Sequence, residues 1–413
     1  MKLKKILLCT SSYKTGGGGI ASYAHDFVNQ FNSAYNIIII THDNYTPSGS
    51  DIKIYHLNMN DFSINNAKKL LIIIDEEKPD IIFNSNFHLL AIISPFIPNN
   101  IKLISISHFV NDKLAWFAGF NAQYIDNIIS LSTYGKHYLE QKFKIKQPDK
   151  ISIIYNYIPS ISTPNILSKI NRNILKIVYP GGCSFYKSAE IVCKAILKLL
   201  QTNLEFELYW LGSIKIPGGN WKFTNTKSIR NILPNDYRIK QLGPVSREEA
   251  QKILKETNIF LLPSRGEGFP ISLLEAMRGG CIPIISDAKH GSLDIITHKK
   301  NGIIIPQNSS QAIVNTLIDI IKKHEQYIHI YTNSLDTINT QLNSHIWNKK
   351  MNILLQKGNN HIPRKQLTQI KFFFLVLKAR TYLIYHFIKD RRRQLYHFIY
   401  FRYLQYCLKS SKD

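Results

Sequence analysis

The chain has 413 residues, of which 44% are hydrophobic, and a formal net charge of +24. This length exceeds the size at which a single hydrophobic core stops growing, so length and apolar content together predict two globular domains. The five cysteines are odd in number, widely scattered and form no CxxC pair. That pattern argues against a disulfide framework and a zinc site, and it favours a reducing cytoplasm.

The first residues, MKLKKILLCTSS, begin with lysines as a signal peptide does. The apolar run from Ile6 to Cys9 is too short for the hydrophobic segment of such a peptide, so it predicts a first β-strand. No stretch reaches the roughly 18 uncharged apolar residues that a membrane-spanning helix needs. We therefore expect a chain that does not cross a bilayer.

The first part of the chain alternates short apolar runs with helix-like polar stretches, which is typical of a parallel sheet covered by helices. A loop-rich stretch from Pro159 to Asn165 predicts the linker, so a first Rossmann-like domain is expected at residues 1–165. Its predicted strands are Ile6–Cys9, Ile37–Thr41, Ile52–Leu57, Ile81–Asn84, Leu103–Ser107, Asn127–Leu131 and Ile151–Tyr155.

A glycine-rich run, TGGGGI, follows the first predicted strand and precedes a helix expected near Ser22. Glycine lets the backbone approach a ligand closely, and a helix start offers unpaired amide groups to an anion. Gly16, Gly17, Gly18 and Gly19 therefore form a candidate ligand loop, although their spacing does not match the dinucleotide fingerprint. A flexible turn without a ligand is the alternative.

His108 follows the strand predicted at Leu103–Ser107. Ligands of open α/β sheets bind at the carboxyl ends of strands, so this side chain is a candidate contact. A lone histidine is more often structural, and the sequence does not show a general base.

A second alternating series predicts a second Rossmann-like domain at residues 170–345. Its predicted strands are Leu175–Tyr179, Phe206–Leu211, Lys240–Leu242, Ile259–Leu262, Ile282–Ser286 and Gly302–Ile305.

Two glutamates, Glu267 and Glu275, lie in the segment IFLLPSRGEGFPISLLEAMRGGCIPII. Pro270 suits a first helical turn and the Gly279–Gly280 pair ends the helix, so Glu267 belongs to a loop after a strand and Glu275 to a helix. One carboxylate can hold sugar hydroxyls and the other ribose hydroxyls, beside helix-start amides that favour an anion. The alternative is that both glutamates are solvated surface charges without a ligand.

This segment resembles the retaining nucleotide-sugar glycosyltransferases of family 4, whose signature is two glutamates separated by seven residues after a Pro-Ser pair. The resemblance covers residues 1 to about 357 and is stronger in the second domain. The matching residues are Pro263, Ser264, Glu267, Gly268, Phe269, Glu275, Ala276, Met277, Gly280 and Pro283.

The resemblance implies a GT-B fold, in which two doubly wound α/β Rossmann-like domains face each other across a cleft. A return helix is then expected at residues 346–360. The implied reaction moves a sugar from a nucleoside diphosphate sugar to an acceptor hydroxyl with retention of the anomeric configuration. No acid-x-acid motif of metal-dependent sugar transferases is present, so neither a metal nor a cofactor is expected.

The resemblance also implies residue roles. Glu267, His108 and Lys187 are the expected catalytic residues, with Lys187 stabilising charge on the departing diphosphate. Glu275 is expected to bind ribose, and the glycine loop at residues 16–19 is expected near the acceptor and the donor phosphates. The other expected donor-binding residues are Gly268, Phe269, Pro270, Gly182, Arg265, Gly212 and Val245.

One position departs from the family pattern. Gly182 stands where the family has the arginine of a glycine-arginine-leucine motif. Lys194 or Arg265 can substitute for that arginine, or backbone amides can hold the phosphates.

Residues 363–413 hold 12 Lys and Arg against 2 Asp and Glu. This basic, aromatic composition predicts a helical tail that docks on an anionic membrane surface, with the protein peripheral on the inner face of the cell membrane. Packing on the enzyme or on a second copy, and binding of RNA or DNA, are the alternatives. One predicted face holds Ile370, Phe373, Phe374 and Leu377, and another holds Lys371 and Lys378.

The leading hypothesis is thus a glycosyltransferase that acts on a lipid-linked glycan in polysaccharide biosynthesis of the O-antigen or capsule type. A GT-B nucleotide-sugar epimerase, which needs no acceptor, is one alternative. A non-catalytic nucleic-acid-binding protein is the other, and it would show salt-sensitive affinity for oligonucleotides. Nucleic acid is the less expected partner.

Overall fold

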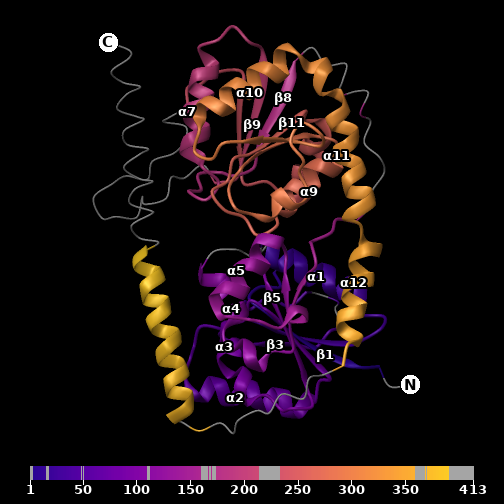
Figure 1. The fold of residues 1–413 in the computed structure, drawn as a ribbon, viewed down its shortest axis with the longest axis vertical. Coiled ribbons are helices and arrows are strands. Elements are labelled where there is room, and N and C mark those ends of the chain that lie inside the picture. The colour runs from indigo at the N-terminus through magenta and orange to yellow at the C-terminus, as the bar shows by residue number, and fades with distance from the viewer. Residues whose placement is uncertain are drawn as a thin grey trace. The chain divides into compact units, whose positions relative to one another are not determined.

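The computed structural model describes residues 3–14, 18–47, 49, 51–108, 112–159, 166, 169, 174–213, 233–358, 368 and 370–389. The chain divides into two compact units (Figure 1). The first unit comprises Met1–Asn156 with Ser344–His386, and the second comprises Tyr157–Asn343 with Phe387–Asp413. We call them the first and second domains.

The first domain is built on a seven-stranded parallel sheet in the order β3-β2-β1-β4-β5-β6-β7. Its strands are β1 Lys5–Thr10, β2 Asn36–Thr41, β3 Ile54–His56, β4 Ile81–Ser85, β5 Lys102–Ser107, β6 Asn127–Ser130 and β7 Ile151–Ile153. Its helices before the linker are α1 Gly19–Phe31, α2 Ile64–Glu77, α3 His88–Ile93, α4 Asp112–Gly119 and α5 Thr133–Phe143, with the short η1 Ser94–Phe96, η2 Ala122–Tyr124 and η3 Pro148–Lys150.

The second domain repeats this plan with a six-stranded parallel sheet in the order β10-β9-β8-β11-β12-β13. Its strands are β8 Leu175–Tyr179, β9 Phe206–Leu211, β10 Ile239–Gly243, β11 Ile259–Leu262, β12 Ile282–Ser286 and β13 Ile303–Ile305. Its helices are α7 Ala189–Leu200, α8 Arg247–Glu256, α9 Ile271–Arg278, α10 Ser310–Lys322 and α11 Ile328–Gln341, with the short η5 Gly291–Asp294 and η6 His324–Tyr327.

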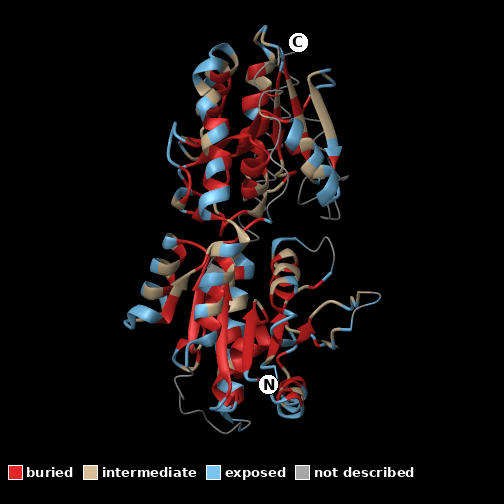
Figure 2. Ribbon diagram, turned by 90° about the vertical axis from the view of Figure 1, so that its right-hand side faces the viewer, coloured by how far each residue is buried: buried red, intermediate tan, exposed pale blue. Residues whose placement is uncertain are grey.

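The strands form because isoleucine-rich runs are buried on both faces of each sheet, which is the environment that parallel strands require. Ile6 of β1, for example, pairs with Ile37 of β2 and Ile81 of β4, and all three are buried. Figure 2 shows the central strands of both sheets buried along most of their length, whereas the edge strands β3 and β10 are mostly half-buried. Each strand expected from the sequence is present, which confirms the predicted α/β class.

The chain returns to the first domain through α12, Ser344–Gln356. Trp347 is buried and its ring contacts those of Tyr23, Phe27 and Phe31 in or near α1. At the other end of α12, the Lys102 ammonium donates to the carbonyl oxygens of Leu354 and Lys357. Burial lowers the pKa of Lys102 to about 8, which still leaves the ammonium protonated at neutral pH. The return helix is therefore fixed at both ends.

A last described helix spans residues 370–389, and its residues up to His386 belong to the first domain and pack on its core. Figure 1 draws it in yellow. Within the described ranges, no helix combines the length and the apolar composition that crossing a membrane demands. Most of the basic tail beyond this helix lies outside the described residues.

Candidate functional site

Three strand ends of the second domain are joined by hydrogen bonds between their glycine loops. The amide of Gly182, after β8, donates to the carbonyl oxygen of Leu211 at the end of β9 at 2.8 Å. The amide of Gly212, after β9, donates to the carbonyl oxygen of Gly243 at the end of β10 at 2.8 Å. Since all three strands are parallel, these loops meet at the carboxyl edge of the sheet, where such folds bind ligands.

Gly182 has a structural reason to be glycine. Its φ is +52°, in the left-handed region, and a Cβ atom built on it would lie 2.6 Å from the backbone nitrogen of Ser213. A side chain at this position would force the two glycine loops apart. An arginine at this position, as in the family motif, would therefore clash with the backbone that this chain adopts.

Lys187 and Glu267 form an ion pair at the same edge of the sheet. Glu267 lies in the loop after β11, between the loops that follow β8 and β12, and its side chain is 9% exposed. The loop is held from the neighbouring segment, because the amide of Gly291 donates to the carbonyl oxygen of Gly268 at 2.9 Å. Phe269 is buried beside it. The structure therefore brings the predicted lysine and the predicted first glutamate together.

Other polar groups after β11 and β12 belong to the same neighbourhood, although the sequence reasoning did not single them out. His290 is buried, and its Nε2 lies 3.5 Å from the Ser286 hydroxyl. Burial lowers the pKa of His290, while the nearby Glu267 carboxylate opposes the shift, so the imidazole is neutral at pH 7. The position of His290 shortly after the end of β12 is the feature of the sequence that could have identified it.

Three buried polar atoms of this neighbourhood have no hydrogen-bond partner within the described part of the chain. They are the hydroxyls of Ser264 and Ser292 and the Nδ1 atom of His290. Buried polar groups are ordinarily satisfied, so these atoms suit a ligand that is rich in hydroxyl groups.

Arg265 supports the loop that leads to Lys187. Its guanidinium donates to Asn308 Oδ1 at 2.8 Å and to the Phe185 carbonyl oxygen at 2.6 Å, and it forms an ion pair with buried Glu190. Its guanidinium carbon also lies over the Phe185 ring, 4.2 Å from the centroid. The Arg265 donors are thus engaged within the protein. Lys194, the other possible substitute for the missing arginine, is exposed on α7.

Glu275 projects from α9 and is held by α8. Its Oε1 atom accepts from Arg247 Nε at 2.8 Å and from Gln251 Nε2 at 3.4 Å, and its side chain is 10% exposed. Arg247 was not identified from the sequence. Pro270 immediately precedes α9, and Val245 lies half-buried in the loop after β10.

The far ends of α8 and α9 are joined by a buried lysine. The Lys169 ammonium donates to the carbonyl oxygens of Leu254 at 2.9 Å, Thr257 at 2.6 Å and Gly280 at 3.4 Å. A positive charge at the carboxyl ends of two helices is favourable because carbonyl dipoles converge there. The helix that carries Glu275 is therefore fixed relative to the helix that carries Arg247.

In the first domain, His108 follows β5 and its Nε2 lies 2.8 Å from the Ser85 hydroxyl. The Tyr23 ring meets it edge-on, with centroids 5.0 Å apart. Burial of the ring lowers the pKa of His108 to about 3, so the imidazole stays neutral at physiological pH. A ring with so low a pKa is a weak base, so it suits hydrogen bonding better than proton abstraction.

The glycine loop of the first domain is partly described. Gly18 has a φ of +84° and precedes α1, which begins at Gly19 and not near Ser22 as expected. Among the described residues, nothing beyond the chain neighbours lies within 4 Å of a Cβ atom built on Gly18 or Gly19. Gly16 and Gly17 lie outside the described residues.

Asp43 fixes the chain that leads into this loop, and the sequence reasoning missed it. One carboxylate oxygen accepts from the Ser12 hydroxyl and from the amides of Tyr13 and Lys14, at 2.7 to 2.9 Å. Burial alone would raise the pKa of Asp43, but these hydrogen bonds, with one from Thr41, lower it. The position of Asp43 shortly after the end of β2 is the feature of the sequence that could have identified it.

Comparison with known families matches both domains. Residues 168–335 match the family described as glycosyl transferases group 1, and residues 17–160 match glycosyltransferase family 4. These two ranges together cover most of the chain.

Two curated relatives cover shorter parts. The chain is 28% identical over 125 residues to the amylovoran biosynthesis glycosyltransferase AmsK of Erwinia amylovora, which is 29% of this chain and 30% of AmsK. It is 24% identical over 222 residues to the UDP-Gal:alpha-D-GlcNAc-diphosphoundecaprenol alpha-1,3-galactosyltransferase of Escherichia coli, which is 50% of this chain and 54% of that protein. The matches thus span about half of these relatives or less.

Among solved structures, Anabaena HepE in complex with UDP-glucose matches 85% of this chain and 99% of its own, with a TM-score of 0.68 and 15% sequence identity. At this identity the likeness shows the fold alone. It confirms the predicted GT-B fold class with two Rossmann-like domains.

Replacement of Gly182 by alanine tests the contact between the glycine loops. Gly182→Ala should lower the free energy of unfolding by about 2–4 kcal/mol, since a left-handed φ and a backbone clash are combined there. Gly243→Ala is the matched control, because φ is +76° there but nothing lies within 4 Å of a Cβ. Urea unfolding followed by circular dichroism measures both, and equal losses would show that the clash is relieved without cost.

A second prediction concerns pH. The His108 pKa is about 3 in the folded chain against an ordinary value of 6.5, so unfolding takes up a proton when the pH lies between these values. The contribution of the neutral His108 ring to the free energy of unfolding is therefore complete above pH 6.5, and it is lost as the pH falls towards 3. The wild type should lose up to about 1.4 kcal/mol per pH unit more than His108→Gln across that window.

Urea unfolding at a series of pH values measures that difference. The control is His137→Gln, since the His137 side chain on α5 is 64% exposed, and this variant should keep the wild-type slope. Parallel slopes for wild type and His108→Gln would contradict the lowered pKa of His108.

Proposed function

Because the chain is a family 4-like glycosyltransferase with relatives in polysaccharide biosynthesis, we propose that it transfers a sugar from a nucleoside diphosphate sugar to an acceptor hydroxyl with retention of the anomeric configuration. The observation that carries this proposal is the Lys187–Glu267 ion pair at the carboxyl edge of the second sheet. The Lys187 ammonium supplies the positive charge that a diphosphate requires. The Glu267 carboxylate supplies an acceptor for the hydroxyl groups of a sugar.

The donor diphosphate is proposed to take Lys187 as its counter-ion. In the reaction, the bond between the anomeric carbon and the diphosphate oxygen breaks, and a bond from that carbon to the acceptor oxygen forms. The bonding electrons leave with the nucleoside diphosphate, and the acceptor proton is released. The Lys187 ammonium then stabilises the charge that grows on the leaving group.

The sugar is proposed to occupy the place that Lys187 leaves at Glu267. Once the ammonium turns to the diphosphate, the Glu267 carboxylate is available to accept from sugar hydroxyls. The buried hydroxyls of Ser264 and Ser292 supply further polar contacts in the same neighbourhood. The amides of Gly268 and Phe269 are the proposed donors to the sugar.

The nucleoside is proposed to bind at α9 through its ribose. Arg247 and Gln251 both bond the same oxygen of Glu275, Oε1, so they orient the second oxygen for the ribose hydroxyls. The nucleotide is proposed to be a uridine diphosphate, because the Escherichia coli relative is named for a UDP-Gal donor and HepE was solved in complex with UDP-glucose.

The acceptor is proposed to be a sugar linked to a lipid diphosphate. The Escherichia coli relative is named for such an acceptor, GlcNAc-diphosphoundecaprenol, and AmsK is named for amylovoran biosynthesis. His108, kept neutral by burial, is proposed to hydrogen-bond the acceptor or the transferred sugar.

Turnover is proposed to need no metal, since Lys187 supplies the positive charge for the diphosphate.

A donor panel tests the proposal. Purified protein is incubated with UDP-glucose, UDP-galactose, UDP-GlcNAc and GDP-mannose, with and without a synthetic lipid-diphosphate sugar, and products are identified by mass spectrometry and NMR. The expected product is a disaccharide with the donor's anomeric configuration, formed equally well after EDTA treatment. An inverted product would contradict the retaining mechanism, and an epimerised sugar from donor alone would identify the epimerase alternative.

Two variants and one control test the proposed roles of Glu267 and Glu275. Glu267→Gln should lower kcat about 10²–10³-fold, because a charged contact to the reacting sugar is lost. Glu275→Ala should raise the donor KM about 10–100-fold, because a hydrogen bond to a charged group contributes roughly 1.5–3 kcal/mol. Glu248→Gln, on the exposed start of α8, is the control and should behave as wild type. Full activity of both site variants would sink the assignment.

A further inference from the structure

The helix at residues 370–389 has one face packed on the protein and one face in solvent. Phe372, Val376 and Ala379 are buried in the core of the first domain. The Tyr382 ring stacks on Trp116 of α4, with centroids 4.3 Å apart. This packing fixes which residues the opposite face presents.

The opposite face is strongly apolar. In the part of the chain that the structure describes, eight of the fifteen exposed large hydrophobic residues lie in this one helix. Single exposed hydrophobic residues are ordinary, but a concentration of this kind marks an interaction surface. The eight residues are Ile370, Phe373, Phe374, Leu377, Ile384, Tyr385, Phe387 and Ile388, and we call them the apolar face.

The charges of the helix all have one sign. Residues 370–389 contain Lys371, Lys378, Arg380 and Lys389 and no acidic residue. Lys371, Lys378 and Arg380 are exposed. Basic side chains beside an apolar helix face match the anionic headgroups and the acyl boundary of a bilayer.

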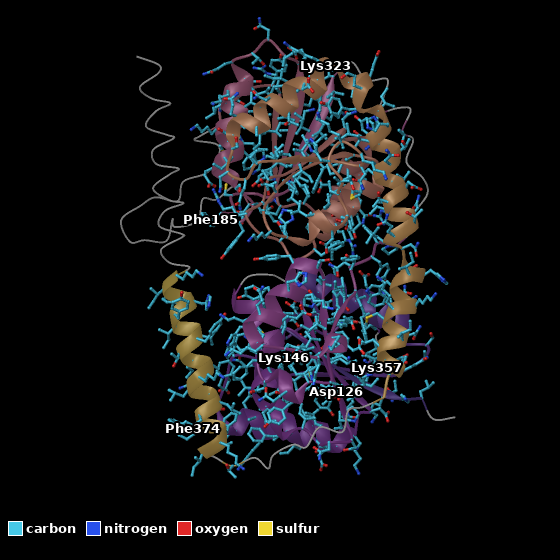
Figure 3. The ribbon with its side chains drawn as sticks, in the orientation of Figure 1. Asp126, Lys146, Phe185, Lys323, Lys357 and Phe374 are labelled. Carbon is cyan, nitrogen blue, oxygen red and sulfur yellow. The ribbon has the colours of Figure 1, made fainter. Side chains whose placement is uncertain are left out.

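A cavity of about 1140 Å³ extends this positive surface. Lys378 lines it from the helix, with its Nζ 5.3 Å from the centroid of the Phe120 ring. Figure 3 labels Phe374 of the apolar face together with three lining residues of the cavity. The charged residues that line the cavity are Lys144, Lys146, Lys150, Lys357 and Lys378, with Asp126 and Asp149.

Two other occupants fit less well. A second copy of the chain, placed face to face, would bring basic residues together with no carboxylate in the helix to neutralise them. Nucleic acid would leave the aliphatic side chains of Ile370, Leu377 and Ile384 without a stacking partner, since base stacking uses aromatic rings.

We propose that the apolar face of helix 370–389 docks on an anionic lipid bilayer, with the helix lying in the plane of the interface and its lysines and arginine at the headgroups. The opposite face keeps the helix attached to the first domain, so docking holds that domain at the membrane as a peripheral protein. This surface goes beyond the proposed function, because it needs neither donor nor acceptor.

Vesicle co-sedimentation of the full chain, without substrates, tests the proposal. The protein should bind phosphatidylcholine vesicles that contain phosphatidylglycerol and should bind pure phosphatidylcholine vesicles weakly. The combined variant Phe373→Ser, Phe374→Ser, Leu377→Ser should weaken binding about tenfold or more, since it removes the apolar contact. Its control is Ile72→Ser with Ile353→Ser, which replaces exposed apolar residues of α2 and α12 and should bind as wild type.

A second variant tests the contribution of the basic residues beside the apolar face. Lys371→Gln, Lys378→Gln, Arg380→Gln should reduce binding to the anionic vesicles and its sensitivity to salt, while Lys68→Gln with Lys69→Gln, exposed on α2, should not. Circular dichroism melting checks that each variant is folded.

Three outcomes would overturn the proposal. The first is wild-type vesicle binding by the folded serine variant, which would place the contact in another part of the chain. The second is a dimer, detected by analytical ultracentrifugation, that the serine variant abolishes while vesicles bind neither protein. The third is salt-sensitive binding to oligonucleotides without binding to anionic vesicles. Because substrates are absent, none of these outcomes depends on the proposed transferase reaction.

Discussion

The part of the second domain that carries the two glutamates is anchored by the buried ammonium of Lys169. The Lys169 ammonium satisfies carbonyl oxygens at the ends of α8 and α9, and a buried charge is tolerated only when its donors are engaged in this way. Its attachment to both helices sets the distance across which Arg247 reaches Glu275. The position of α9 in turn sets the loop before it, which carries Glu267. One lysine outside the site thereby supports both glutamates of the signature.

Much of the fold could be predicted from the sequence, because the strands are apolar runs that only a buried parallel sheet accommodates. The end of α9 could also be predicted, because paired glycines stop a helix, and it ends at Arg278 before them. The start of α1 was predicted too late, since nothing in a run of four glycines shows which of them takes up helical dihedrals. Gly18, with its positive φ, lies immediately before the helix.

Residues of the candidate site could be predicted where a sequence motif identifies them. Their contacts could not be predicted where those contacts join segments far apart in the sequence. Glu267 and Lys187 were expected from the resemblance, and the structure pairs them. The engagement of Arg265 with Glu190 and Asn308 depends on segments far apart in the sequence, so no local pattern shows it. The same holds for helix 370–389: its apolar residues were evident, but only the packing shows which of them face the protein.

If the proposed function holds, the Lys187–Glu267 ion pair has a consequence for discrimination among sugars. A free hexose carries no charge with which to draw the ammonium away, so it meets a carboxylate that is already occupied. A nucleoside diphosphate sugar brings its own anion and exchanges one ionic partner for another. Under the proposed function, this competition takes place where the carboxylate is largely shielded from water and where ionic interactions are stronger than in bulk solvent. The ion pair would then favour activated sugars over unactivated ones.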